Sequence, residues 1–144
     1  MRTTVSAHER IEASAPTLFD CVADYAVAPL FIEGLHRLTP VSSSTSGEGA
    51  RFDAVMRVGP RTFRTTIEIT AYEEGRLVTW ASTSGQAQVL TFELVPDGKA
   101  TKVALEISYE KPGGLTGVLT APVVEETVRL RARSALRRLR DHVS

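Results

Sequence analysis

The chain has 144 residues, a length that predicts one domain spanning residues 1–144 and a well-buried core. Lysine and arginine total 17, as do aspartate and glutamate, so the protein has no strong field of one sign, and we expect no nucleic-acid partner. The single cysteine, Cys21, excludes an intrachain disulfide. The sequence has no apolar run long enough to cross a bilayer and no signal-peptide pattern. These two features, with the single cysteine, predict a soluble, cytoplasmic protein.

The first third of the chain predicts one strand and two short helices. Residues 4–13 alternate between apolar and polar side chains, as a half-buried strand does. Ser14 is a good N-cap and Pro16 is tolerated in a first helical turn, so a short helix should follow. Asp24 can cap a second helix, which Gly34 should end.

From residue 35 to residue 110 the apolar period changes to two, and glycine, proline and aspartate recur at short intervals. This pattern is typical of consecutive antiparallel strands joined by hairpins. The six predicted strands are residues 35–43, 50–58, 62–72, 77–84, 88–95 and 101–110.

Alternation along these strands predicts a dry face and a wet face. The dry face carries most of the large apolar side chains and, with the fifth strand oriented accordingly, the single tryptophan, Trp80. Arg51, Arg57 and Arg64 fall on the wet face.

The C-terminal third predicts one long amphipathic helix. Apolar residues recur at intervals of mostly three and four from Ala121 to Val143, after a less regular segment that includes Leu119 and Val123. Residues 129–144 contain six arginines and one aspartate. These arginines either form a solvated face or, through Arg129, Arg133, Arg137 and Arg140, a landing surface for an anionic membrane.

The order of these elements resembles the helix-grip fold of the START and birch-pollen-allergen superfamily, also called SRPBCC, and within it the bacterial polyketide cyclase/dehydrase and lipid-transport branch. The resemblance covers nearly the whole chain and rests on packing and capping motifs. These are residues 11–16, 18–19, 22–25, 29–31, 49–52, the strand 77–85 with Trp80, residues 92–96 and the final helix.

The resemblance implies an α+β fold in which a curved seven-stranded antiparallel sheet wraps around the C-terminal helix, with two short helices after the first strand. This architecture implies a central cavity, although periodicity alone is equally compatible with a filled core. The expected lining is Phe52, Met56, Thr65, Ile67, Trp80, Phe92, Leu105, Tyr109, Leu119 and Val123.

Polar groups in such a cavity have two interpretations. Trp80, Tyr109 and Thr65 either orient a ligand or bond a neighbouring backbone carbonyl. Glu33 and His36 follow the second helix, where the resemblance places the cavity mouth, and they either gate it or are ordinary surface charge.

The sequence predicts no catalytic group, no metal site and no cofactor. His8, His36 and His142 are far apart in the chain, without ligand spacing. Cys21 is better explained as a small buried hydrophobe than as a nucleophile. Glu9 shares the parity of Ile11 and is the one carboxylate expected to face inward.

The sequence therefore predicts a monomer or homodimer that binds a small hydrophobic molecule, such as a lipid, polyketide or isoprenoid, for sequestration or transport. A polyketide-type aromatase, cyclase or dehydratase is one alternative. Another is an interaction module that associates with ribosomes or quinone. Without a catalytic group, the non-enzymatic interpretation is favoured.

Overall fold

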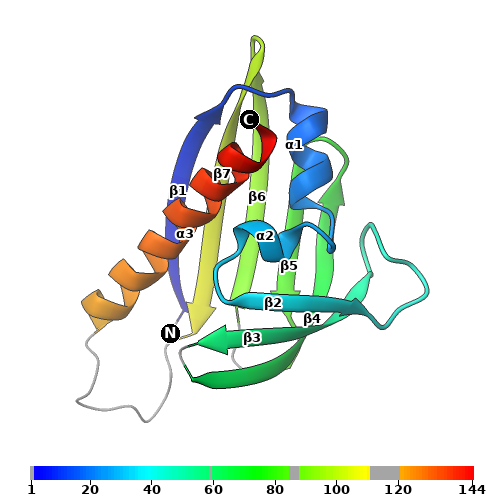
Figure 1. Cartoon of the computed structure of the whole chain (residues 1–144), viewed down its shortest axis with the longest axis vertical. Helices are drawn as coiled ribbons and strands as arrows, with labels where there is room; N and C mark the ends of the chain where they lie inside the picture. Colours follow the sequence, from blue (N-terminus) through cyan, green and yellow to red (C-terminus); the bar gives the residue numbers. More distant parts are fainter. Residues whose placement is uncertain (1, 59, 85–87, 111–120) are drawn as a thin grey trace.

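An antiparallel sheet curves around one long C-terminal helix (Figure 1). The computed structural model describes residues 2–58, 60–84, 88–110 and 121–144. The strands are β1 (Arg2–Ile11), β2 (Leu35–Pro40), β3 (Arg51–Val58), β4 (Arg61–Glu73), β5 (Leu77–Ser82), β6 (Gln88–Asp97) and β7 (Ala100–Glu110). The helices are α1 (Ala15–Val22), α2 (Ala28–Phe31) and α3 (Ala121–Val143).

The seven strands lie in the order β1-β7-β6-β5-β4-β3-β2, and every pair is antiparallel. Each strand from β2 to β7 is therefore a neighbour of the next, as the run of hairpin signals predicts. β1 returns to the far side and pairs with β7, where Val5 lies opposite Ile107. The predicted fold class, with two short helices after the first strand, is confirmed.

Local sequence explains α1 well and α2 less well. The Ser14 hydroxyl accepts a hydrogen bond from the Thr17 backbone N–H at 3.3 Å, which caps α1 as expected. The longer second helix expected between Asp24 and Gly34 was wrong, because α2 is a single turn. The Asp24 carboxylate instead accepts from the Ala26 N–H at 2.9 Å and stabilises the turn before α2.

Two register shifts interrupt the regular ladders. One lies between Leu35 and Arg37 in β2, and the other between Ile69 and Ala71 in β4. An extra residue of this kind bends a strand and changes which side chains share a face. After the second shift, the Tyr72 ring packs edge-on against Phe19 of α1, with ring centroids 5.3 Å apart.

The core lies between the concave face of the sheet and the helices α1, α2 and α3. Ala132, Leu136 and Leu139 bury one side of α3 against β1 and β7. Of the irregular segment expected before the last helix, residues 115–120 lie outside the described residues. The expectation was wrong for Val123, because its backbone already belongs to α3. No helix in the described part of the chain is both long and apolar enough to cross a membrane.

Candidate functional site

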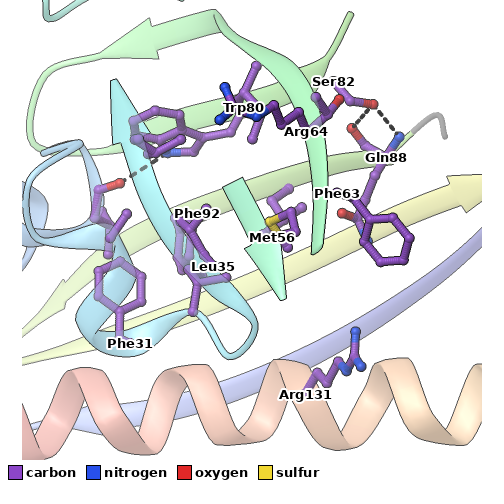
Figure 2. A pocket seen from close by; sticks show the side chains of 17 residues that line it. Phe31, Leu35, Met56, Phe63, Arg64, Trp80, Ser82, Gln88, Phe92 and Arg131 are labelled. Carbon is purple, nitrogen blue, oxygen red and sulfur yellow. Dashed lines mark hydrogen bonds between the residues drawn. The ribbon is translucent and has the colours of Figure 1, made fainter. Parts of the chain in front are cut away.

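A cavity of about 370 Å³ lies between the concave face of the sheet and the helices (Figure 2). This volume is within the range of about 300–1,000 Å³ that is usual for small-molecule sites. The described residues that line it are Val22, Ala28, Phe31, Ile32, Leu35, Leu38, Met56, Phe63, Arg64, Thr65, Ile67, Trp80, Ser82, Gln88, Leu90, Phe92 and Arg131.

Most of this lining is apolar, and strand alternation explains how it is built. Met56 of β3 lies opposite Phe63 of β4, and both side chains face the cavity. Among the buried lining residues, Phe31 of α2 packs edge-on against Phe92 of β6, with ring centroids 5.9 Å apart. Phe63 lines the cavity yet remains 44% exposed, so it lies where the cavity meets solvent.

The hydroxyl and indole groups of the lining already have backbone partners. The Trp80 indole N–H donates to the Val22 carbonyl oxygen at 3.1 Å. The Thr65 hydroxyl donates to the Ser84 carbonyl oxygen at 2.5 Å, and the Ser82 hydroxyl accepts from the Gln88 backbone N–H at 2.8 Å. These polar side chains therefore hold the wall together, and an apolar ligand meets few groups that need a polar partner.

The structure places the ten side chains of the predicted lining in three groups. Five of them line the cavity: Met56, Thr65, Ile67, Trp80 and Phe92. Three others, Phe52, Leu105 and Tyr109, are buried in the core and do not line it. Leu119 lies outside the described residues, and the side chain of Val123 does as well.

The two residues expected at the cavity mouth, Glu33 and His36, are exposed and do not line the cavity. Tyr109, the other expected polar group, is 3% exposed. Burial raises the pKa of its hydroxyl; Glu125 raises it further and Arg129 lowers it, which places the ring close to the N-terminal half of α3.

Arg64 of β4 and Arg131 of α3 are the charged residues of the described lining, and sequence reasoning missed both. Alternation placed Arg64 on the wet face of the sheet. Arg131 lies beside the apolar stripe of the helix, and a helical pattern does not say which flank of the stripe faces a cavity. The lining residues from α1, α2 and β2 were missed for a similar reason, because their approach to the sheet depends on the connections between elements.

Glu9 and Cys21, two groups with the chemistry of a base and a nucleophile, do not line the cavity. Glu9, expected to face inward, forms an ion pair with Arg140 of α3 at 3.0 Å, and its side chain is 24% exposed. Cys21 is partly buried in α1, and burial, with Asp20 and Asp24 nearby, raises the pKa of its thiol. In the described part of the chain, no three histidine, cysteine, aspartate or glutamate side chains lie close enough to hold a metal ion.

Two of the four arginines expected to form a membrane surface have acidic partners. Arg129 lies 3.2 Å from Glu126, and Arg140 pairs with Glu9 and with Asp141. Arg133 and Arg137 are exposed and form no ion pair with any described residue. The free positive charge of α3 is thus smaller than its composition suggests.

The sequence matches, over residues 2–144, the family described as polyketide cyclase / dehydrase and lipid transport. No protein of curated function matches it closely enough to count as a relative.

Solved structures resemble the fold at low sequence identity. The protein TTHA0849 from Thermus thermophilus is 20% identical with a TM-score of 0.82, and the match covers 98% of this chain and 97% of that one. A START superfamily protein from Mycobacterium smegmatis is 16% identical with a TM-score of 0.79, covering 97% and 96%. The major latex-like protein 151 from Panax ginseng is 15% identical with a TM-score of 0.73, covering 98% and 97%.

Proposed function

Since this chain belongs to the polyketide cyclase/dehydrase and lipid-transport family, we propose that it binds a small hydrophobic molecule between its sheet and its helices and sequesters or transports it. Lipids, polyketides and isoprenoids are the ligand classes of suitable character. The observation that carries this proposal is the largely apolar cavity of about 370 Å³. Removing apolar ligand surface from water supplies the main driving force for binding in such a site.

The hydrogen bonds within the cavity wall support ligand binding rather than catalysis. Trp80, Thr65 and Ser82 each bond the protein backbone, so these groups are not arranged to polarise the carbonyl groups of a substrate.

Cyclisation or dehydration of a polyketide-like substrate is the second candidate function. The family description favours it, and Arg131 in the cavity wall is a residue type that can stabilise a developing enolate. Incubating the protein with a poly-β-ketone and following aromatic products by absorbance distinguishes catalysis from carriage, because a carrier returns the ketone unchanged.

Native mass spectrometry of gently purified protein tests the binding proposal. We expect the protein mass plus one hydrophobic adduct, which organic extraction releases for identification. A parallel titration with hydrophobic compounds should shift the emission of Trp80, because this single tryptophan lines the cavity. No adduct and no emission change across a broad panel of compounds would contradict the proposal.

The cellular setting follows from the same proposal. Residues 1–144 form one helix-grip domain, monomeric or homodimeric, that acts in the cytoplasm. Arg133 and Arg137 of α3 supply an electrostatic contact with anionic membranes from which a lipid is collected or to which it is delivered.

A further inference from the structure

We propose that the ligand is an amphiphilic acid, with an apolar body in the cavity and a carboxylate bound by Arg131. This inference rests on the proposed binding function and names the chemical class of the ligand. It follows from three properties of the Arg131 side chain: its positive charge, its position in the cavity lining, and its lack of a partner among the described residues.

Arg131 lies on the flank of α3 that faces the cavity. Ala132, Ala135 and Leu136 direct the buried side of the helix to the core, and Arg131 is offset from them by about one quarter turn. Figure 2 shows its side chain extending from α3 toward the region of Met56 and Phe63. Arg131 is exposed, so its guanidinium lies at the rim of the cavity, on the side where Phe63 also reaches solvent.

No acidic residue that the structure describes neutralises this charge. The described lining contains arginine but neither aspartate nor glutamate. The residues three and four positions from Arg131 on α3 are uncharged: Thr127, Val128, Ser134 and Ala135. Arg131 forms no hydrogen bond or ion pair with any part of the chain that the structure describes, whereas Arg129 and Arg140 on the same helix are paired.

The other polar groups of the wall do not offer an equivalent anion contact. The donors of Trp80 and Thr65 are bonded to backbone carbonyls. Arg64 is the other cation of the lining. It lies in β4 between the inward-facing Phe63 and Thr65, so strand alternation favours the outer face for its side chain. Of the two cations, Arg131 is the one that we expect to meet the anionic group of a ligand.

A carboxylate suits this position best among the polar groups of hydrophobic molecules. The guanidinium presents planar, paired N–H donors that match two carboxylate oxygens, and charge-assisted hydrogen bonds of this kind are about twice as strong as neutral ones. An ester or an alcohol of the same chain length fills the same apolar space without the charge. The difference in affinity between acid and ester thus measures the contribution of Arg131.

The test compares lauric acid with methyl laurate, below their aggregation concentrations and at a pH where the acid is ionised. Three proteins are used: the unmodified chain, Arg131→Gln, and Arg138→Gln as the matched control, because Arg138 is also an exposed arginine of α3 but does not line the cavity. Trp80 emission and calorimetry report the affinity. We expect the unmodified chain and Arg138→Gln to favour the acid, and Arg131→Gln to lose about tenfold in affinity for the acid and almost none for the ester.

The possible failures are distinguishable. If the ester binds as tightly as the acid, or if Arg131→Gln weakens both compounds equally, the acid inference is overturned while hydrophobic binding stands. If neither of these compounds nor any other in a broad hydrophobic panel binds the unmodified chain, the proposed function itself fails. Equal thermal melting of the three proteins shows that a loss of affinity does not come from unfolding.

Discussion

The indole N–H of Trp80 donates to the backbone carbonyl of Val22 across 3.1 Å, and this bond joins the middle of β5 to the last residue of α1. The indole also packs against Phe52, with ring centroids 5.6 Å apart. One side chain therefore fixes the helical cover to the sheet and forms part of the cavity wall. A substitution of Trp80 should therefore affect both ligand binding and the stability of the fold.

Replacing Trp80 with phenylalanine should destabilise the protein. The smaller ring keeps an apolar surface but leaves the Val22 carbonyl without its donor, in a site where Trp80 is only 7% exposed. A buried polar group without a partner costs about 1–3 kcal/mol, and we expect a loss of that size. Urea unfolding followed by far-ultraviolet circular dichroism measures it, and an unchanged midpoint would show that the bond contributes nothing.

Enlarging Ile67 should block binding with little effect on stability. Ile67 lines the cavity, so the extra ring atoms of Ile67→Phe enter empty space. We expect the free energy of unfolding to change by less than about 0.5 kcal/mol and the affinity for a hydrophobic ligand to fall at least about tenfold. Calorimetric titration and urea unfolding measure the two quantities.

Ile69→Phe is the matched control for that substitution. Ile69 lies on the same face of β4, two residues further along, but it is fully buried and does not line the cavity. Here the added atoms overpack the core, which typically costs about 1–3 kcal/mol. Equal destabilisation by the two substitutions would mean that the cavity is not available for an added side chain.

Most of the fold could be predicted because its signals are local. Hairpin turns, the alternation of apolar and polar residues, and the Ser14 cap each depend on a short stretch of sequence. The predicted family resemblance and fold class are confirmed. The extent of α2 could not be predicted, because Asp24 can cap either a helix or a turn and the sequence does not choose between them.

The site was harder to predict because alternation gives the face of a residue and not its depth. Phe52 and Met56 share the dry face of β3. Phe52, however, packs against the rings of Tyr25 and Trp80, whereas Met56 borders the cavity. The difference depends on which side chains pack above each position, and that is a tertiary property. Arg131 was not predicted because a charged residue beside an apolar stripe usually contacts solvent alone, whereas Arg131 is exposed and also borders the cavity.

Cys21 should react slowly with alkylating agents at neutral pH. Burial, with Asp20 and Asp24 nearby, raises the pKa of its thiol, so less reactive thiolate is present at a given pH than in an exposed cysteine. Labelling with iodoacetamide across a pH series should show the folded protein reaching its maximal rate at higher pH than the same chain in urea. Coincident profiles in the two conditions would contradict this prediction, and Cys21→Ser should remove labelling altogether.

Arg133 and Arg137, two of the unpaired arginines of α3, should contribute to any attraction to anionic membranes. Arg133 and Arg137 are exposed without ion pairs to described residues, and a basic residue near an anionic surface contributes about 1 kcal/mol. Arg133→Gln combined with Arg137→Gln should therefore weaken sedimentation with phosphatidylserine vesicles by at least about tenfold at low salt. The control is Arg129→Gln combined with Arg140→Gln, because these side chains already pair with Glu126 and Glu9, and we expect a smaller loss. Equal losses in both double variants would show that net charge alone, rather than the unpaired face of α3, determines the attraction.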